Sequence, residues 1–173
     1  MRLFVLLSRF PFPLEKGDKL RAFHQLRILS KHHSIHLCAL HEEELEESWV
    51  SEVKQYCTEL KTIRISKASQ ALSLGFSLLG KEPFQVAYFY QSAAQKQVLD
   101  CIKQWKPEAI YCQLLRTAKY VENVKDIPKI IDFQDAFSKG IERRLETDSW
   151  YFKPVLRSEL RRLNQYEQHV FKE

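Results

Sequence analysis

The pattern that decides the fold lies in residues 2–41, RLFVLLSRFPFPLEKGDKLRAFHQLRILSKHHSIHLCALH. The apolar run over residues 2–8 is typical of a strand buried on both faces of a sheet. A loop over residues 9–18 follows, broken by two prolines and a glycine. Residues 34–40 form a second apolar run, which predicts a second buried strand. Because one helical segment joins the two strands, we expect them to pair in parallel.

The helix between these strands is expected over residues 19–32, with Asp18 as its N-terminal cap. An acidic helix over 43–57 and an alternating strand over 60–65 follow. A β-α-β-α-β order with short connections predicts an α/β fold. We therefore expect a Rossmann-like, doubly wound parallel sheet with helices on both faces.

The rest of the chain continues the alternation of helices and strands. Residues 84–90, after Pro83, fit a short strand or an extended loop. The last helix keeps its apolar spacing without a closing Gly, Asn or Pro, which predicts that the parent protein continues beyond residue 173. Strands are expected over 109–113 and 129–133, and helices over 68–80, 92–105, 117–124, 137–147 and 155–172.

Length and charge narrow the class of protein. The 173 residues suit a single domain, and the net charge is +5. Residues 1–41 hold seven basic and two acidic side chains, whereas residues 42–60 hold seven acidic and one basic. This segregation favours an anionic ligand near the N-terminus over a nucleic-acid surface, which usually shows a continuous basic stripe. We therefore expect no nucleic-acid partner.

The spacing of the cysteines and the length of the apolar runs indicate the cellular compartment of the protein. No two of the four cysteines are spaced as a C-x-x-C pair, and the six histidines form no metal-binding pattern. The first apolar run is too short for a signal peptide, and no run approaches the roughly 20 residues of a membrane span. We expect a reduced, cytoplasmic protein without a metal.

Ligands of open parallel sheets bind beyond the carboxyl ends of the strands, and the loop after the first strand is the first candidate. It brings Gly17, Lys19 and Arg21 to a helix N-terminus, where the helix dipole already favours an anion. A bound diphosphate would relieve the clash between these cations and the dipole, and Gly17 would let backbone N–H groups approach it. The alternative is that Asp18 caps the helix and the basic side chains point into water.

Two later strand ends add candidates at the same edge. Gln113 and Arg116 follow one strand, and Arg116 could pair with a phosphate or carboxylate. Asp132 and Asp135 follow the next strand, where they could bind sugar hydroxyls or orient a basic neighbour. The alternatives are a strand-end glutamine beside a surface arginine, and an Asp135 or Ser138 that only caps the next helix.

Four segments resemble retaining, GT4-like bacterial glycosyltransferases (glycosyl transferase group 1) of the GT-B fold, namely residues 3–40, 107–120, 127–138 and 161–173. The first segment is similar to the family's strand, glycine-ending loop, helix and strand, with Gly17 as the loop glycine. The resemblance implies that residues 1–173 are the N-terminal, acceptor-side Rossmann-like domain of a two-domain enzyme. Many relatives carry a histidine where this chain has Gln113, so that histidine's role is not carried over.

The resemblance also implies a function for the parent protein. It would transfer a sugar from a nucleotide-sugar donor to a saccharide or lipid-linked acceptor in cell-surface polysaccharide or glycan synthesis. Its partners would be that donor, that acceptor and its own C-terminal nucleotide-sugar domain, which is absent from residues 1–173. No cofactor is expected, because such enzymes stabilise the leaving diphosphate with basic side chains and helix dipoles. The piece alone is expected to be inactive, and peripheral docking at the inner face of the membrane is an open option.

Two other classes stay open at this point. A non-catalytic Rossmann- or flavodoxin-like domain could bind a ligand or regulate a partner, although the basic first loop argues against a flavin loop. A nucleic-acid-binding module is suggested by the pI of about 9.0. The aromatic residues, however, follow the apolar spacing and are not interleaved with Lys and Arg, as such a module requires.

Overall fold

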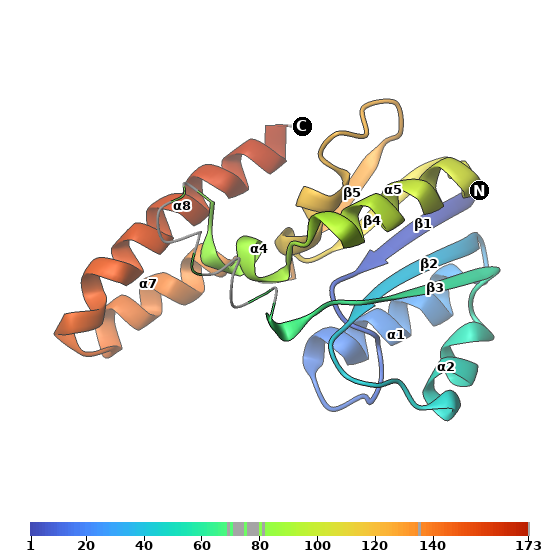
Figure 1. Ribbon diagram of the computed structural model, residues 1–173, viewed down its shortest axis with the longest axis horizontal. Coiled ribbons are helices and arrows are strands. Elements are labelled where there is room, and N and C mark those ends of the chain that lie inside the picture. Colours follow the sequence, from blue (N-terminus) through green and yellow to red (C-terminus); the bar gives the residue numbers. More distant parts are fainter. Residues whose placement is uncertain (69, 71–74, 76–79, 81, 135, 173) are drawn as a thin grey trace.

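The structure is a computed structural model that describes residues 1–68, 70, 75, 80, 82–134 and 136–172. The helix expected over 68–80 falls largely on residues outside this described part. The core of the molecule is a single parallel sheet with the strand order β3-β2-β1-β4-β5 (Figure 1). The strands are β1 (Arg2–Leu7), β2 (Ser34–His41), β3 (Glu59–Arg64), β4 (Ala109–Gln113) and β5 (Lys129–Asp132).

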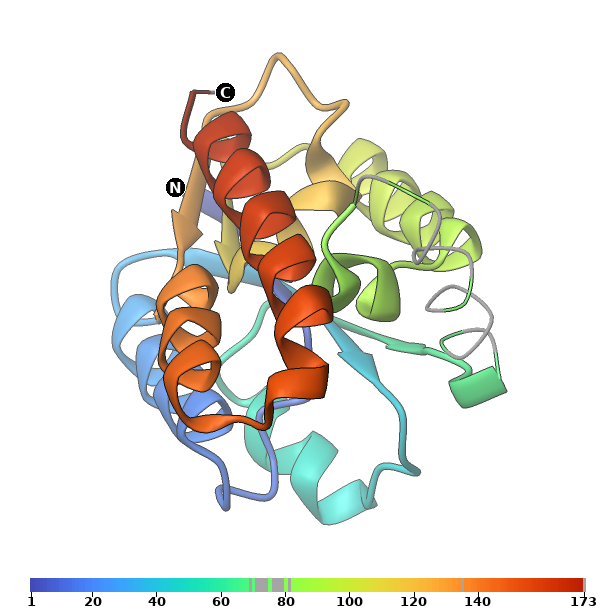
Figure 2. The same ribbon diagram turned by 90° about the vertical axis from the view of Figure 1, so that its left-hand side faces the viewer.

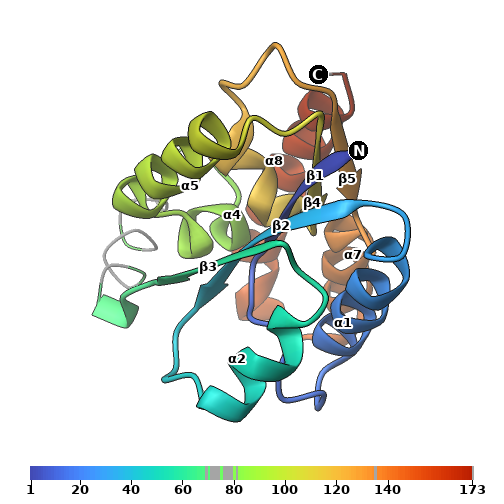
Figure 3. The ribbon, with the colours of Figure 1, turned by 90° about the vertical axis from the view of Figure 1, so that its right-hand side faces the viewer.

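Helices cover both faces of this sheet, which confirms the expected α/β, Rossmann-like fold. On one face lie α1 (Gly17–Leu29) and α2 (Glu47–Lys54), as Figure 3 shows. On the other face α5 (Ser92–Trp105) packs across the strands, beside α4 (Phe84–Phe89). The helix α6 (Leu115–Ala118) and the 3-10 turn η1 (Lys119–Val121) follow β4 on that same face.

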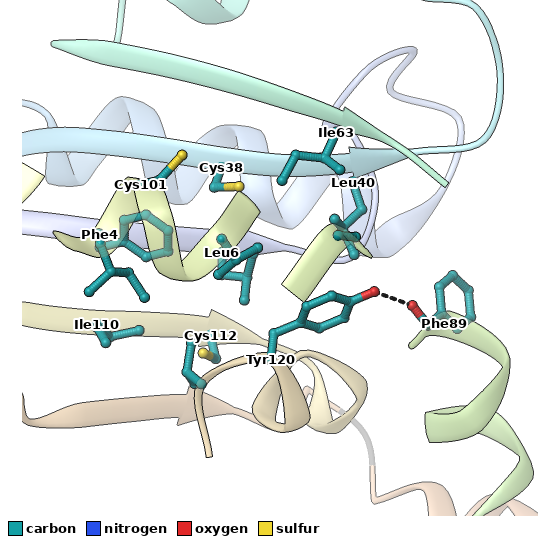
Figure 4. Close-up of a cluster of buried hydrophobic side chains, with 14 of the residues drawn as sticks. Phe4, Leu6, Cys38, Leu40, Ile63, Phe89, Cys101, Ile110, Cys112 and Tyr120 are labelled. Carbon is teal, nitrogen blue, oxygen red and sulfur yellow. Dashed lines mark hydrogen bonds between the residues drawn. The ribbon is translucent and has the colours of Figure 1, made fainter. Parts of the chain in front are cut away.

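The period-two geometry of β1 builds both hydrophobic cores. Phe4 and Leu6 point to the α5 side, into the cluster drawn in Figure 4. Leu3, Val5 and Leu7 point to the α1 and α2 side. All five side chains are buried, because successive residues of a strand face opposite sides and both sides here are covered.

A helical hairpin extends the fold beyond the carboxyl ends of the strands (Figures 1 and 2). It consists of α7 (Phe137–Thr147), the 3-10 turn η2 (Trp150–Phe152) and α8 (Lys153–Lys172). The hairpin has its own apolar contacts, centred on Ile141, Leu156 and Leu163. It is therefore a packed element and not an extended tail.

One sequence-based expectation is wrong, because residues 84–89 form the helix α4 and not a strand or an extended loop. Pro83 stands at the N-terminal end of this helix, where a missing N–H costs nothing. The carboxylate of Glu159, on α8, accepts hydrogen bonds from the N–H groups of Phe84 (2.9 Å) and Gln85 (3.5 Å). This acceptor lies 75 residues away in the chain, so local sequence cannot reveal it.

Smaller differences concern helix ends. The first helix begins at Gly17 after an extended Lys16, so Asp18 lies in the first turn and is not the cap. The acidic helix is shorter than expected and begins at Glu47. The segment expected as a helix over 117–124 is the short α6 followed by η1.

Among the described residues, no helix has the length and apolar character that crossing a bilayer requires.

The sheet core yields a stability prediction. Leu6 is fully buried in the cluster on the α5 side, so Leu6→Ala should lower the free energy of unfolding by about 2–5 kcal/mol. Urea unfolding followed by circular dichroism measures the change. Ile28→Ala is the matched control, since Ile28 is 57% exposed, and it should stay within about 0.5 kcal/mol of the wild type. A loss below about 1 kcal/mol for Leu6→Ala would mean that this cluster is not the packed core.

Candidate functional site

The candidate site lies at the switch point of the sheet, between β1 and β4. Strand β1 pairs with β2 on one side and with β4 on the other. The chain leaves β1 for a helix on one face and leaves β4 for helices on the opposite face. Loops that diverge in this way leave a crevice at the carboxyl edge, where ligands of such sheets bind.

A buried arginine occupies this crevice. The side chain of Arg116 is only 7% exposed. Its Nε donates a hydrogen bond to Ser8 Oγ (2.8 Å), and its Nη2 lies 3.3 Å from Asp18 Oδ2. The same Asp18 oxygen accepts from Arg9 Nη1 at 3.0 Å. One carboxylate oxygen therefore serves two guanidinium groups.

An aromatic ring supports both arginines. Phe89, at the end of α4, has the Arg116 guanidinium carbon 4.0 Å from its ring centre and that of Arg9 at 5.5 Å, which is cation–π geometry. The backbone carbonyl of Phe89 accepts a hydrogen bond from the hydroxyl of Tyr120 (Figure 4). This bond holds the end of α4, and with it the Phe89 ring, against the hydrophobic core of the sheet.

Burial controls the charge of Arg116. Burial, followed by the nearby charge of Arg9, lowers the pKa of Arg116 to about 10, while Asp18 and Glu42 oppose the shift. A pKa near 10 leaves the guanidinium protonated at neutral pH. Arg116 is therefore a fixed cation at the switch point.

The start of α1 adds further positive charge beside this arginine. Lys16 precedes the helix and makes no side-chain capping bond to it. The ammonium of Lys19 donates to the backbone carbonyl of Phe12 at 3.0 Å, and burial followed by the charge of Lys16 lowers the pKa of Lys19. A side chain at Gly17 would meet no atom within 4 Å. The Asp18 carboxylate accepts the backbone N–H of Lys19 at this N-terminus (3.0 Å), and the surrounding cations are close enough to disfavour one another.

A small pocket opens against these cations. Its volume is about 90 Å³, which is room for a few water molecules. Basic side chains of the first loop and first helix face the acidic segment that follows β2. This arrangement suits a ligand with an anionic group and hydroxyl groups, because carboxylates accept from hydroxyls. The pocket is lined by Ser8, Arg9, Phe10, Phe12, Lys16, Lys19, His41, Glu42, Glu43, Glu44, Leu45 and Trp49.

A second polar cluster lies on the β5 side of α1. Arg21 makes a two-nitrogen contact with Asp132, with Nε and Nη2 at 3.1 and 3.0 Å from Oδ2. Gln25 Nε2 (2.9 Å) and the Tyr111 hydroxyl (2.7 Å) donate to the same oxygen. Three donors from α1 and β4 thus meet one carboxylate from β5, and the cluster holds these elements together.

The hydrogen bonds of this cluster stabilise the ionised carboxylate. Burial opposes ionisation of Asp132, but the hydrogen bonds from Gln25, Tyr111, the Gln134 backbone and Arg21 outweigh it and lower its pKa. Burial, together with the hydrogen bond to Asp132, raises the pKa of Tyr111. Asp132 is therefore an anion with a nearly complete set of donors.

The structure separates the seven residues that the sequence singles out. The first group, Gly17, Lys19, Gln113 and Arg116, lies at the switch point, where Gln113 Nε2 donates to the Asp18 carbonyl at 2.8 Å. Arg21 and Asp132 pair with each other in the second cluster, which is the orienting role weighed for Asp132. Asp135 lies outside the residues that the structure describes.

Four contributors were missed by the sequence-based reasoning. Ser8 and Arg9 directly follow a buried strand, so the sequence could have predicted that they lie at the carboxyl edge of the sheet. Asp18 was noted only as a cap, although its carboxylate bridges two arginines. Phe89 carried no signal, because its role depends on the unexpected helix α4.

Comparison with known proteins gave no match to this chain among family models, curated proteins or solved structures. Within the described part of the chain, no group of three or more His, Cys, Asp or Glu side chains could hold a metal ion. The fold alone does not define a function, which depends on the chemistry of the site.

The second cluster predicts a pH-dependent stability. Asp132→Asn should lower the free energy of unfolding at pH 7 by about 1–3 kcal/mol, because Arg21 and Tyr111 lose an ionised acceptor. The folded pKa of Asp132 lies below its usual value of 3.8, so its contribution is present above that value and is lost as the pH falls below it. Urea unfolding at neutral pH and at about pH 3 should therefore show wild type and variant converging in acid.

The control for this measurement is Asp126→Asn, because Asp126 is exposed. Its difference from the wild type should be small at both pH values. A loss in Asp132→Asn that is equally large at both pH values would contradict the ionised-acceptor account.

Proposed function

We propose that this chain is the acceptor-side domain of a GT-B-type glycosyltransferase and that its first loop contacts the diphosphate of a nucleotide-sugar. The observation that carries the proposal is the gathering of Arg9, Lys16, Lys19 and Arg116 at the switch point, beside the N-terminus of α1. The resemblance of four chain segments to GT4-like enzymes agrees with this placement.

Three glutamates balance the three basic side chains of the pocket lining, so the binding of an added anion depends on which of these cations are already paired. Asp18 is shared between Arg9 and Arg116, whereas Lys16 is exposed and Lys19 donates only to a neutral backbone carbonyl. A diphosphate could accept from both lysines and from the N–H groups of Gly17 and Asp18 at the start of α1, which are charge-assisted and dipole-favoured contacts. The N–H of Lys19 already donates to Asp18. The glutamates across the pocket would then face the hydroxyl-bearing part of the ligand.

These residues would act by electrostatic stabilisation. In sugar transfer an acceptor hydroxyl oxygen bonds to the anomeric carbon while the bond from that carbon to the diphosphate oxygen breaks. The electron pair leaves with the diphosphate, which takes up the hydroxyl proton. Cations held in place before the reaction stabilise that developing charge. Arg9, Lys16 and Lys19 line the pocket and would touch the leaving group, whereas buried Arg116 would position Asp18 and Arg9. No cofactor is required for this step.

A second candidate is a non-catalytic domain that binds an anionic ligand. The small pocket with its cationic wall favours this candidate as well, because such binding needs no second domain. The two candidates share the binding step and differ only in whether a sugar is transferred.

The binding step is tested with inorganic pyrophosphate. In a titration followed by amide NMR, the signals of Gly17, Asp18 and Lys19 should shift and saturate. Lys16→Gln/Lys19→Gln should weaken this binding by roughly tenfold or more, because two charge-assisted contacts are lost. The matched control is Lys31→Gln/Lys54→Gln, which removes two exposed lysines elsewhere. Equal affinity of the two variants, or no saturable shift in the wild type, would refute the proposed site.

The transfer step is tested on the protein expressed from the complete reading frame of its gene. With a panel of nucleotide-sugars, we expect release of nucleoside diphosphate that depends on an added saccharide or lipid-linked acceptor. Lys16→Gln/Lys19→Gln should reduce this release, and the control variant should not. Pyrophosphate binding without any transfer would favour the non-catalytic candidate over the glycosyltransferase.

A further inference from the structure

The turn between α7 and α8 exposes a contiguous apolar surface. Trp150 is 81% exposed, Tyr151 58%, Phe152 50% and Val155 49%. The ring centres of Trp150 and Tyr151 lie 6.1 Å apart, and those of Tyr151 and Phe152 lie 4.6 Å apart. We call these four residues the aromatic tip. Three adjacent aromatic side chains on a surface are costly in water and call for an explanation.

The hairpin does not need the aromatic tip for its own packing. Its apolar contacts are made by Ile141, Leu156, Leu163 and their neighbours further along the two helices. Glu167 of α8 also accepts from the backbone N–H and hydroxyl of Ser138 at the start of α7. The two helices are thus held together without the tip, which leaves its aromatic rings available to a partner.

The aromatic tip also projects away from the rest of the molecule. It lies at one end of the longest axis, beyond the carboxyl edge of the sheet (Figure 1). The 20 residues of α8 make that helix about 30 Å long. A protruding position suits insertion into a soft surface better than it suits a flat contact with another protein.

Basic residues lie on both sides of the aromatic tip in the sequence. Residues 143–157 contain four basic and two acidic side chains. Arg143 and Arg157 are exposed, and one of the two acids, Asp148, is already paired with Arg144 at 2.8 Å. The apolar tip is thus flanked by positive charge, which is complementary to an anionic surface.

We propose that the aromatic tip inserts into the headgroup region of a membrane that contains anionic lipids. Tryptophan and tyrosine favour the membrane interface because their rings are apolar and their polar atoms stay hydrated. Nearby Lys and Arg add attraction to anionic headgroups. The tip exposes an apolar area of the order of 400 Å², about half of what each partner buries in a stable protein complex. The membrane is therefore the occupant that the chemistry and area fit.

The proposal is tested by sedimenting the chain with vesicles of phosphatidylcholine, with and without phosphatidylglycerol, in the absence of any nucleotide-sugar. The wild type should bind the phosphatidylglycerol vesicles more strongly than the neutral ones. Trp150→Ser/Tyr151→Ser/Phe152→Ser should lower the partition coefficient at least about tenfold. The matched control Leu20→Ser/Ile28→Ser also removes exposed apolar side chains, and it should bind like the wild type.

A charge variant keeps the test decisive if the triple variant fails to fold. Arg143→Glu/Arg157→Glu leaves the aromatic rings in place and should weaken binding to phosphatidylglycerol vesicles several-fold. Failure of the wild type to bind these vesicles, or full binding by the triple and charge variants, would overturn the proposal. Concentration-dependent dimers that the triple variant abolishes, without vesicle binding, would also overturn it and assign the tip to a second copy.

Discussion

Asp18 accepts hydrogen bonds from the guanidinium groups of Arg9 and Arg116, and its backbone carbonyl accepts one from the amide of Gln113. These contacts join the loop after β1, the start of α1 and the segment after β4. A buried guanidinium without a counter-ion is strongly unfavourable, so Arg116 requires Asp18 to stay in the first turn of α1. The pairing of Arg116 with Asp18 therefore also fixes the orientation of the first turn of α1.

Two carboxylates divide the cations of the carboxyl edge into different roles. Asp132 takes Arg21 and ties α1 to β5, whereas Asp18 is shared by two arginines and leaves Lys16 and Lys19 facing the pocket. Residues of the same type therefore differ in what they can bind. The side chains that already have full partners hold the fold together, and those that lack an anion are the ones suited to a ligand.

The alternation of strands and amphipathic helices was enough to predict the sheet, because the central strands β1, β2 and β4 are mostly apolar. The helix α4 could not be predicted, since its N–H groups are satisfied by Glu159 from the far end of the chain. The candidate site, too, was predictable where local sequence decides and not where distant contacts decide. Gly17 and Arg116 could be placed at the sheet edge by strand position, but the pairing of Arg21 with Asp132 across 111 residues depends on tertiary packing.

The ion pair at the switch point is tested most directly by a double-mutant cycle of Asp18→Ala and Arg116→Met, with the free energy of unfolding measured by urea denaturation. The two residues contact each other through a largely buried pair, so their losses should not add. We predict a coupling energy of about 1.5–3 kcal/mol, as for hydrogen bonds to charged groups. A coupling energy near zero would contradict the account, because the first loop and the start of α1 would then be held in place by other contacts.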